Sequence, residues 1–395
     1  MKIHSIDELN VSERRVFLRV DFNVPEEDGV ITDDTRIRAA LPTIQDLQKA
    51  GARLVIASHF GRPKGEKNPK YSLGNVGERL SEILNQDIIF PEECDHSSIK
   101  KLSFGLKENE ILLLENLRFT PEEEANSDDF AKRLSEYADV YVNDAFGASH
   151  RAHASIVGVP KYLKEKGAGR LMMKEIEAFR RILESPKKPF IAIMGGSKVA
   201  DKLPVVTSLL DRVSSLLIGG GMSYTFLKAR GLKVGSSLVD ESFLLRAKTF
   251  LDKAERRNVK VLLPVDHIIS TSIDGKGKIS ETAGPEIQSG WMGVDIGPKT
   301  VEAFAKEIRI ARTIVWNGPM GVSEHEPFHK GTFEIAKIIA TSSAYSVVGG
   351  GDSVAAINRT GVAKRISHLS TGGGAALELL KGKSLPGIQA LEVEK

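Results

Sequence analysis

The sequence has a single cysteine, Cys94, among its 395 residues. One cysteine cannot form an internal disulfide, and its isolation excludes both thiolate metal clusters and CxxC redox chemistry. Cys94 stands between acidic residues, and an acidic neighbourhood disfavours the thiolate form that a nucleophile needs. We therefore expect an inert cysteine in a loop.

Long hydrophobic runs are also missing. No stretch approaches the roughly 18 apolar residues of a membrane span, and Met1 opens into a polar segment without the apolar region of a signal peptide. The formal net charge of +3 is too balanced for a dedicated nucleic-acid binder. We expect a cytoplasmic protein that acts on neither nucleic acid nor membrane.

Several standard catalytic motifs are absent. The sequence contains no G-x-x-x-x-G-K-[ST] and no G-x-G-x-x-G, because the glycine triplets at 349–351 and 372–374 both lack the last glycine. These absences weigh against a standard P-loop NTPase and an ordinary NAD-binding dehydrogenase. H-E-x-x-H and G-x-S-x-G are missing as well.

Apolar runs of strand length alternate with amphipathic helical stretches along the whole chain, which is typical of βαβ units and parallel sheets. A chain of 395 residues exceeds one ordinary hydrophobic core, so we expect two domains of about 200 residues each. The expected strands cover residues 16–20, 54–57, 111–114, 140–142, 190–194, 216–218, 261–263, 313–316 and 346–348.

A helix is expected between the two halves. Apolar residues from 172 to 183 follow a helical stripe, and Pro186 and Pro189 end it. The triplet Gly167-Ala168-Gly169 before it interrupts the pattern. We expect this helix to join two domains between hinge-capable residues; the alternative is an ordinary helix inside one larger domain.

Basic side chains follow the expected strands of the first half: Arg36, His59, Arg62, Arg118 and Arg151. A single loop arginine is usually solvated and a lone histidine is usually structural, so the signal is their recurrence at equivalent places. Ligands bind at the carboxyl ends of parallel strands, and several guanidinium groups there suit a small, multiply anionic ligand such as a phosphorylated carboxylate. Asp21 and Asn23 would accept hydrogen bonds from its hydroxyl group.

Glycine takes the place of arginine after the strands of the second half. Glycine allows a ligand to approach the backbone closely, although glycine turns also make ordinary tight connections. We interpret the series as a nucleotide site, with Gly350, Gly351, Asp352 and Ser353 beside phosphates. Asp352 is a candidate Mg²⁺ ligand, Glu324 would take ribose hydroxyls, and Lys198 and Lys202, one helical turn apart, would reach phosphates.

The stretch 366–376 follows the same plan. A short apolar run ends at Ser370-Thr371, three glycines follow, and residues 375–380 are helix-forming. The exposed amides of such a turn, together with the helix dipole, favour an anion.

These residues resemble the phosphoglycerate kinase family, and the shared motifs cover nearly the whole chain in the family's order. They are Val20-Asp21-Phe22-Asn23-Val24-Pro25, Ser58-His59-Phe60-Gly61-Arg62-Pro63, Glu115-Asn116-Leu117-Arg118-Phe119, His150-Arg151-Ala152-His153-Ala154-Ser155, Gly196-Ser197-Lys198-Val199 with Lys202, Leu263-Pro264-Val265-Asp266, Trp316-Asn317-Gly318-Pro319, Gly349-Gly350-Gly351-Asp352-Ser353 and Ser370-Thr371-Gly372-Gly373-Gly374-Ala375.

The resemblance implies an α/β fold of two Rossmann-like parallel-sheet domains joined by a helix, with a cleft between them. Residues 1–168, completed by 376–395, would form the N-terminal domain for 3-phosphoglycerate or 1,3-bisphosphoglycerate. Residues 169–186 would form the interdomain helix, and 187–375 the domain for ATP or ADP with Mg²⁺. A monomer is expected.

The resemblance also implies a role for individual residues. The acid-substrate site would contain Asp21, Asn23, Arg36, His59, Phe60, Gly61, Arg62, Arg118 and Arg151. The nucleotide site would contain Lys202, Gly219, Gly220, Gly293, Asn317, Pro319, Glu324, Gly350, Gly351, Asp352 and Ser353, with Asp352 at the metal. Arg36, Lys198 and the amides of Gly372, Gly373 and Gly374 would act on the transferred phosphoryl group.

Departures from the family pattern are small. Ser323 stands where the family often has an aromatic residue, and Ala148-Ser149 replaces a more usual small-polar pair.

The implied reaction is ATP + 3-phosphoglycerate ⇌ ADP + 1,3-bisphosphoglycerate, with hinge closure. Its nucleophile is an ionised carboxylate, so no general base is needed, and positioning and charge stabilisation would carry catalysis. Two other classes stay open: a dinucleotide-dependent oxidoreductase and a catalytically silent metabolite-binding protein.

Overall fold

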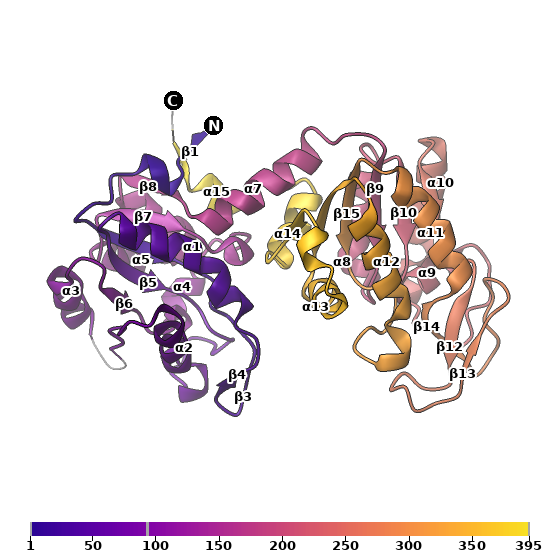
Figure 1. Cartoon of the computed structure of the whole chain (residues 1–395), viewed down its shortest axis with the longest axis horizontal. Coiled ribbons are helices and arrows are strands. Elements are labelled where there is room, and N and C mark those ends of the chain that lie inside the picture. Colours follow the sequence, from indigo (N-terminus) through magenta and orange to yellow (C-terminus); the bar gives the residue numbers. More distant parts are fainter. Residues whose placement is uncertain (1, 92–94, 394–395) are drawn as a thin grey trace. The chain divides into compact units, whose positions relative to one another are not determined.

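The computed structural model describes residues 2–91 and 95–393, so the expectation for Cys94 falls outside the described residues. The chain divides into two compact units (Figure 1). The first unit comprises Met1–Ile176 and Ser384–Lys395, and the second comprises Glu177–Lys383.

The first unit is built on a five-stranded parallel sheet in the order β6-β5-β2-β7-β8. Its strands are β2 (Arg15–Arg19), β5 (Arg53–Ala57), β6 (Ile111–Leu113), β7 (Val140–Asn143) and β8 (Glu165–Ala168). Four of the five are buried throughout or almost throughout, which explains their continuous apolar sequences. Two short antiparallel pairs complete the strands: β1 (Lys2–Ile3) with β18 (Glu392–Val393), and β3 (Glu26–Glu27) with β4 (Val30–Ile31).

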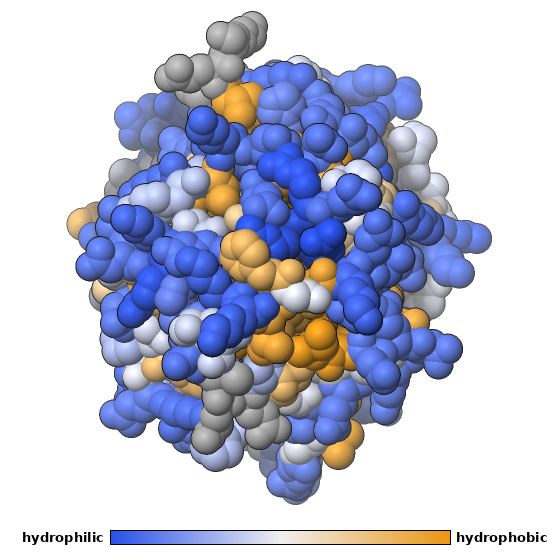
Figure 2. Space-filling model, turned by 90° about the vertical axis from the view of Figure 1, so that its left-hand side faces the viewer, coloured by the Kyte–Doolittle hydropathy of each residue, from blue (hydrophilic) through white to orange (hydrophobic). Residues whose placement is uncertain are grey.

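Helices of the first unit flank this sheet (Figure 1). They are α1 (Thr35–Lys49), α2 (Gly74–Leu84), α3 (His96–Gly105), α4 (Pro121–Glu124), α5 (Asp128–Ser135), α6 (Val159–Tyr162) and α15 (Pro386–Gln389). Shorter helical turns are η1 (Ile6–Glu8), η2 (Pro69–Tyr71), η3 (Leu117–Phe119), η4 (Phe146–Ala148) and η5 (Ala154–Gly158). The main core packs the apolar faces of α1 and α2 against β2, β5, β6 and β7. The outer face in Figure 2 is mostly hydrophilic, with apolar side chains gathered in one area.

The second unit contains a six-stranded parallel sheet in the order β11-β10-β9-β15-β16-β17. Its strands are β9 (Phe190–Met194), β10 (Ser215–Ile218), β11 (Lys260–Leu262), β15 (Thr313–Asn317), β16 (Tyr345–Gly349) and β17 (His368–Leu369). A separate antiparallel sheet has the order β13-β12-β14, formed by β12 (His267–Ser270), β13 (Ile279–Glu281) and β14 (Met292–Ile296).

Helices of the second unit are α8 (Val199–Leu209), α9 (Met222–Ala229), α10 (Leu244–Arg256), α11 (Pro298–Ile310), α12 (Lys330–Thr341), α13 (Gly351–Thr360) and α14 (Gly374–Leu380). Three short turns accompany them: η6 (Glu241–Phe243), η7 (Glu326–Phe328) and η8 (Ala363–Arg365). The core joins α11, α12 and α13 to β9, β15 and β16 around the fully buried Trp316.

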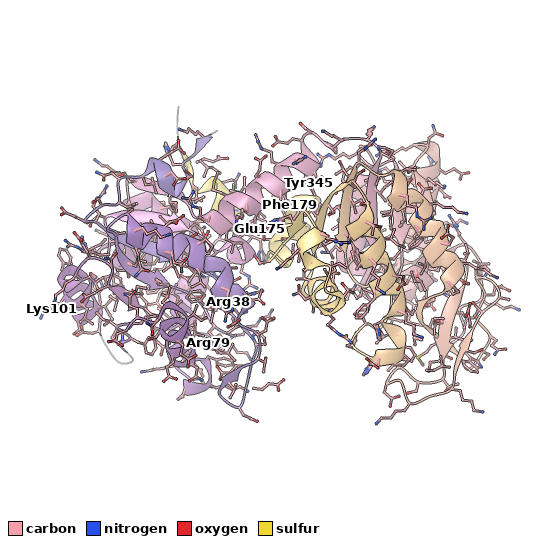
Figure 3. The ribbon with its side chains drawn as sticks, in the orientation of Figure 1. Arg38, Arg79, Lys101, Glu175, Phe179 and Tyr345 are labelled. Carbon is pink, nitrogen blue, oxygen red and sulfur yellow. The ribbon has the colours of Figure 1, made fainter. Side chains whose placement is uncertain are left out.

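Helix α7 (Arg170–Leu183) crosses the boundary between the units, which falls after Ile176. Glu175 and Phe179, labelled in Figure 3, are buried on either side of that boundary. At its start, Arg170 binds Asp46 through Nε at 2.8 Å and Asp7 through Nη2 at 2.6 Å. Toward its end, the guanidinium of Arg181 lies 3.9 Å above the ring of Tyr345.

All nine strands expected from the apolar runs are present, and the α/β fold with two parallel-sheet units is confirmed. Two local expectations were wrong. Gly167 and Ala168 do not interrupt the pattern of strands and helices, because they lie in the edge strand β8 and pair with β7. The joining helix, expected over residues 169–186, covers only Arg170–Leu183.

Other features had no counterpart in the sequence analysis. The antiparallel sheet was not expected, because β13 is exposed throughout and carries no apolar run. Residues 376–383, which the resemblance assigned to the N-terminal domain, fall within the second unit, and the chain returns to the first unit at Ser384. None of the helices in the described part of the chain has the length and apolar character needed to cross a membrane.

Candidate active site

The strand order of each parallel sheet creates one position where a ligand fits. In the first unit the chain proceeds from β2 to β5 and β6 on one side, and to β7 and β8 on the other. In the second unit it proceeds likewise from β9 to β10 and β11, and to β15, β16 and β17. Ligands of open α/β sheets bind beyond the carboxyl ends of the strands at such switch points. The sites in the two units are therefore expected after β2 and after β9.

Asp21 follows β2 and is the anionic centre of the first site. Its Oδ1 accepts a hydrogen bond from Arg36 Nη1 at 3.0 Å and lies 3.9 Å from His59 Nε2. Arg36 is the second residue of α1, and Asp34 stands directly before this helix. The Asp34 carboxylate binds both Arg38, at 2.9 Å, and Arg79, at 2.7 Å (Figure 3).

The loop after β5 is held in place by side-chain amides. Asn23 Oδ1 accepts from the Gly61 amide at 2.8 Å, and Asn116 Oδ1 accepts from the Phe60 amide at 3.1 Å. Asn116 Nδ2 in turn donates to the Phe60 carbonyl at 2.7 Å. Gly61 has a φ of +59°, and a Cβ there would lie 2.3 Å from the ring of Tyr71, so only glycine fits. Phe60 and Gly61 thus shape the loop, and the exposed Arg62 follows it.

Arg118 is the most deeply buried arginine of the predicted set, with 2% of its surface exposed. Its Nη1 donates to the Gly61 carbonyl at 2.7 Å, and its Nε lies 3.1 Å from Glu124 Oε1. Nη2 is buried without a hydrogen-bond partner. Burial, together with the positive charge of Arg151, lowers the pKa of Arg118 to about 10. A buried cation with an unused donor is ready to bind an anion.

Arg151 completes the basic cluster. It is half-buried, and its Nε donates to His150 Nε2 at 3.3 Å. The positive charges of Arg19, Arg118, Arg151 and Arg36 all act on His59, and together with burial they hold its pKa well below the ordinary value. The structure therefore brings Asp21, Arg36, His59, Arg118 and Arg151 together, as the sequence predicted.

Three buried residues of this cluster were missed. Arg19 is fully buried at the end of β2, and Glu123 and Ser155 are also fully buried. Glu123 accepts from the amide of Ser155 at 2.9 Å and from its hydroxyl at 2.6 Å. An arginine inside a buried parallel strand was a usable signal for Arg19. Glu123 gave no such signal, because it stands in an acidic run that resembles a solvated surface.

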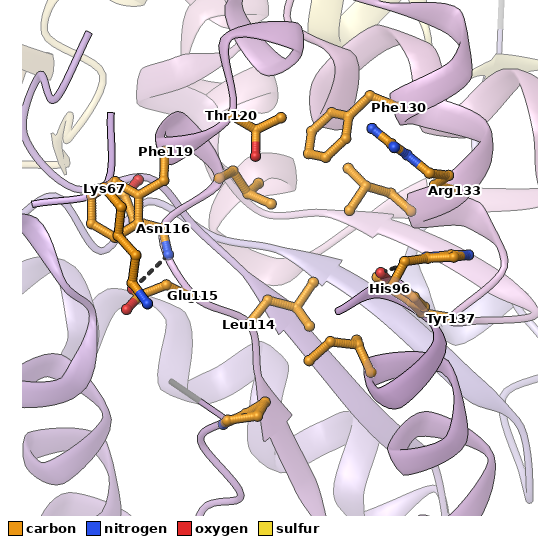
Figure 4. A pocket seen from close by; sticks show the side chains of 14 residues that line it. Lys67, His96, Leu114, Glu115, Asn116, Phe119, Thr120, Phe130, Arg133 and Tyr137 are labelled. Atoms are coloured by element: carbon orange, nitrogen blue, oxygen red, sulfur yellow. Dashed lines mark hydrogen bonds between the residues drawn. The ribbon is translucent and has the colours of Figure 1, made fainter. Parts of the chain in front are cut away.

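A cavity of about 370 Å³ lies behind η3, on the side of α3 and α5 (Figure 4). Phe119, Phe130 and Leu134 line it with Arg133, and His96 hydrogen-bonds Tyr137 at its wall at 2.8 Å. Asn116, which holds the loop after β5, also lines this cavity together with Leu117. None of the predicted basic residues lines it. The cavity is thus separate from the basic cluster.

In the second unit, several glycines are required by backbone packing. A Cβ at Gly195 would lie 2.1 Å from the Pro319 carbonyl oxygen, and one at Gly220 would lie 2.4 Å from the Gly196 amide nitrogen. A Cβ at Gly219 would meet the Met320 sulfur at 2.6 Å. These glycines let the loops after β9, β10 and β15 approach one another. At these positions glycine is therefore required by the packing of one loop against another.

Gly351 and Gly373 differ, because a Cβ at either would meet no atom within 4 Å. Gly351 opens α13, and Gly373 precedes α14. The Gly372 amide already donates to Ser370 Oγ at 3.1 Å. Open space above Gly351 and Gly373 leaves room for a ligand at both places.

Lys202 and Lys198 are in different environments. Helix α8 begins at Val199, so Lys198 stands before the helix and is exposed, whereas Lys202 is within the helix and 9% exposed. Lys202 Nζ donates to Asn317 Oδ1 at 2.5 Å and to the Asn317 carbonyl at 3.2 Å. Burial lowers the pKa of Lys202 to about 8. The expectation that both lysines lie on one helical face was wrong.

Asn317 also has an unused donor beside α13. Its Nδ2 is buried without a hydrogen-bond partner. The position that a Cβ of Gly350 would occupy is 3.3 Å from this nitrogen. Ser353, at the same helix start, accepts from the Gly318 amide at 2.8 Å. A buried amide, a helix N-terminus and Lys202 thus surround one small region, which suits phosphate oxygens.

The remaining predicted residues lie around this region or on its loops. Asp352 is exposed in the first turn of α13, and Glu324 is exposed in the loop after β15. The carbonyl of the neighbouring Ser323 accepts from Arg359 Nη1 at 2.9 Å. Gly293 lies in β14, where a Cβ would collide with the Tyr224 hydroxyl at 1.9 Å.

The donor set around Asp352 fits Mg²⁺. Within residues 2–91 and 95–393, no cluster of three or more His, Cys, Asp or Glu side chains is arranged to hold a metal ion. Mg²⁺ does not need such a cluster, because it is usually held by one or two carboxylates together with substrate phosphates and water. One exposed carboxylate beside a helix N-terminus matches that pattern.

Comparison with known proteins decides the family. The sequence matches the family described as phosphoglycerate kinase over residues 6–383. The chain belongs to the phosphoglycerate kinase family. The family's protein from Leptospira biflexa is 52% identical over 391 residues, covering 99% of this chain and 98% of the relative. The one from Acidobacterium capsulatum is also 52% identical, over 398 residues, with 98% of each chain covered.

Solved structures of the family have the same fold. The phosphoglycerate kinase from Coxiella burnetii superposes with a TM-score of 0.89 at 41% identity, covering 99% of each chain. The enzyme from Pyrococcus horikoshii OT3 gives a TM-score of 0.82 at 36% identity, with 98% of each chain covered.

Family membership fixes the class of reaction. The chain is a kinase, hence a transferase, and its family's reaction is the glycolytic transfer of a phosphoryl group between ATP and 3-phosphoglycerate. This excludes the dinucleotide-dependent oxidoreductase that the sequence had left open.

Proposed function

We propose that the first unit binds 3-phosphoglycerate or 1,3-bisphosphoglycerate at the basic cluster after β2. Asp21 and Asn23 accept from its hydroxyl group, and Arg36, His59, Arg62, Arg118 and Arg151 bind its anionic groups, on the loop shaped by Phe60 and Gly61. The observation that carries this proposal is the buried Nη2 of Arg118, a cationic donor without a partner. A dianionic phosphate would satisfy it.

The second unit binds ATP or ADP after β9. Lys202, Asn317 and the start of α13, residues 350–353, take the phosphates. The loops around Gly219, Gly220, Gly293 and Pro319 form the base site, and Glu324 binds the ribose. Asp352 holds the Mg²⁺ that accompanies the nucleotide, and this ion neutralises phosphate charge when bound. Support comes from the unpartnered Asn317 amide and from the open space above Gly351.

Phosphoryl transfer proceeds without a general base, because the attacking group is an ionised carboxylate. Arg36 and Lys198 stabilise the charge on the equatorial oxygens of the transferred group, together with the amides of the 372–374 turn. Gly373 and Gly374 are the stronger candidates among these amides, because the Gly372 amide already binds Ser370. Each preorganised donor of this kind typically contributes ~3–4 kcal/mol.

Closure brings the two substrates together and excludes water from the transfer. Residues 1–168 and 384–395 act as the acid-substrate domain, 187–383 as the nucleotide domain, and 169–186 as the helix between them. The anchoring of α7 to Asp46 and Asp7 at its start and to Tyr345 near its end supports a stiff connector. Small-angle scattering tests closure: the radius of gyration should fall with both substrates bound and not with either alone.

A coupled assay with 3-phosphoglycerate and ATP tests the function itself. Lys198→Ala should lower kcat by about 100-fold or more while the nucleotide dissociation constant changes by less than about threefold. Equal losses in both would assign Lys198 to binding alone. Arg133→Ala, which removes an exposed guanidinium outside the basic cluster, serves as the control and should leave both constants unchanged.

Arg118→Met separates the two substrates. It should raise KM for 3-phosphoglycerate by at least about tenfold and leave KM for ATP unchanged, because a buried charge-assisted bond is lost on one side only. A rise in both values would contradict the assignment of the acid substrate to the first unit. Asp352→Asn should lower the apparent affinity for Mg²⁺ in assays at limiting metal.

We also infer a monomer in the cytoplasm. Size-exclusion chromatography with light scattering checks the first statement, where a mass near the 43.1 kDa of one chain is expected. Fractionation of the source cells checks the second.

A further inference from the structure

Arg19 is an unusual residue for its position. It ends the central strand β2 of the first unit and has no exposed surface. Burying a guanidinium group is costly unless its donors are satisfied. A residue that only filled the core at this position would be apolar, like Leu18 before it and Val20 after it. The charge of Arg19 therefore requires an explanation from its contacts.

The Arg19 guanidinium is directed at three acceptors of the first unit. Nε donates to Ser155 Oγ at 2.8 Å, and Nη1 donates to the Val20 carbonyl. Nη2 lies 3.3 Å from Nδ1 of His59. These contacts direct the guanidinium group of Arg19 toward the protein interior. Because Arg19 has no exposed surface, it supports the site rather than binding the substrate itself.

The contact with His59 fixes a proton. A guanidinium group has donors only and no lone pair to offer. Nδ1 of His59 must therefore be the acceptor, and the ring proton must be on Nε2. Nε2 lies on the other side of the ring, 3.9 Å from Asp21 Oδ1. We propose that Arg19 is a positioning residue that holds His59 as the neutral Nε2–H tautomer, so that His59 serves the acid substrate as a fixed hydrogen-bond donor.

The surrounding charges keep the ring neutral. Arg19, Arg36, Arg118 and Arg151 act on it from β2, α1, η3 and the loop after β7, and Asp21 is the carboxylate in its ion-pair range. Four cations and burial outweigh one carboxylate, so a second ring proton is disfavoured. His59 thus donates one hydrogen bond without adding a charge that changes with pH.

A second buried layer sets the orientation of Arg19. The Ser155 hydroxyl donates to Glu123 Oε1 at 2.6 Å, so its lone pairs face Arg19 Nε. Glu123 also accepts from the Ser155 amide at 2.9 Å, and it has no exposed surface. Glu123, Ser155, Arg19 and His59 form one directed chain of hydrogen bonds. Within this chain the Ser155 hydroxyl donates to Glu123 and therefore accepts from Arg19, and Arg19 Nη2 donates to His59 Nδ1.

This inference rests on the proposed function only where it assigns His59 to the substrate; the tautomer itself belongs to the free protein. Nitrogen-15 NMR of the ligand-free full chain, labelled at histidine, tests it directly. His59→Gln assigns the resonance. The expected pattern is a protonated Nε2 and an unprotonated Nδ1 that stay constant from pH 5.5 to 8. A proton on Nδ1, or a titration within that range, would overturn the proposal.

Variants then test the role of Arg19. Arg19→Met should release the ring, so that its nitrogen shifts report a mixture of the two neutral tautomers and KM for 3-phosphoglycerate rises about tenfold. kcat and KM for ATP should stay within about twofold. Arg19→Lys, which keeps one donor and the charge, should restore part of the affinity. An unchanged KM with an unchanged tautomer in Arg19→Met would refute the positioning role.

Folding and function need separate controls. Because Arg19→Met removes the positive charge that compensates the buried Glu123 carboxylate, the double variant Arg19→Met with Glu123→Gln is measured beside it and should give the same tautomer and the same KM. Arg15→Met removes an arginine from the same strand, where it binds Asp139 away from the site, and should change neither reading. If His59→Phe leaves KM unchanged while the NMR pattern is as expected, the tautomer stands and the placement of His59 in the substrate site fails.

Discussion

The buried Lys202 should make the ligand-free protein less stable than it would be with an apolar residue in its place. Burial lowers its pKa from 10.5 to about 8. At pH 7 the folded state therefore holds an ammonium group at a free-energy cost of 2.5 pKa units, or about 3 kcal/mol. Lys202→Met removes this cost and also removes the two bonds to Asn317, which offset part of it at about 1–2 kcal/mol. The net effect at pH 7 is a small stabilisation.

The pH dependence is the sharper test. Between the folded pKa of about 8 and the unfolded value of 10.5, the unfolded chain binds more protons, so the stability of the wild type rises with pH. The difference in unfolding free energy between wild type and Lys202→Met should therefore change by about 2–3 kcal/mol from pH 7 to pH 10. Urea unfolding followed by tryptophan fluorescence measures it, since both Trp291 and the buried Trp316 lie in the second unit.

Two comparisons decide the outcome. Lys198→Met removes an exposed ammonium group just before the same helix and is the matched control for the loss of a lysine. Parallel stability curves for wild type and Lys202→Met from pH 7 to pH 10 would refute the reasoning, because they would mean that Lys202 is solvated. ATP should stabilise the wild type far more than Lys202→Met, since phosphate oxygens would compensate the buried charge.

Two further predictions concern other buried positions. Gly293→Ala places a methyl group 1.9 Å from the Tyr224 hydroxyl, so it should lower the unfolding free energy by about 1–3 kcal/mol and raise KM for ATP, as checked by urea unfolding and the coupled assay. Burial raises the pKa of Asp144 from 3.8 to about 6, so the folded state binds more protons between these values and stability falls there as pH rises. Asp144→Asn keeps the acceptor for the Met172 amide and should remove about 3 kcal/mol of this loss of unfolding free energy. The unfolding free energy of both proteins is measured between pH 4 and pH 6.5, and the same pH dependence in both would contradict the prediction.

The positions of the strands could be predicted from the sequence because buried parallel strands are continuously apolar. Residues 16–20 and 190–194 are each an unbroken or nearly unbroken apolar run, and each became the central strand of its sheet. The residues that follow each strand could also be identified, because an abrupt change from apolar residues to charged residues or glycine marks the end of a buried strand. Arg118 and Asp352 were found in this way.

Other residues were not readable because their meaning depends on distant contacts. Glu123 has the sequence of a surface residue, yet it is fully buried against Ser155, 32 positions away. Gly195 and Gly220 were interpreted through a ligand, whereas their first requirement is the packing of backbone against backbone. Gly167 stands in a Gly-Ala-Gly triplet of the kind found at hinges, but it lies in the edge strand β8 and pairs with β7. Local composition carries no information about these partners.

The fold class, the resemblance to the family and the positions where charged residues follow buried strands could all be predicted from the sequence, because burial periodicity and motif spacing are properties of the chain. The tertiary structure alone decided which nitrogen of His59 is protonated, which lysine is buried, and which glycines are held by packing. Those outcomes depend on directed contacts and desolvation among residues far apart in sequence. Arg19 illustrates both kinds of information. The sequence shows a charged residue within an apolar strand, and the structure shows the three groups that its guanidinium contacts.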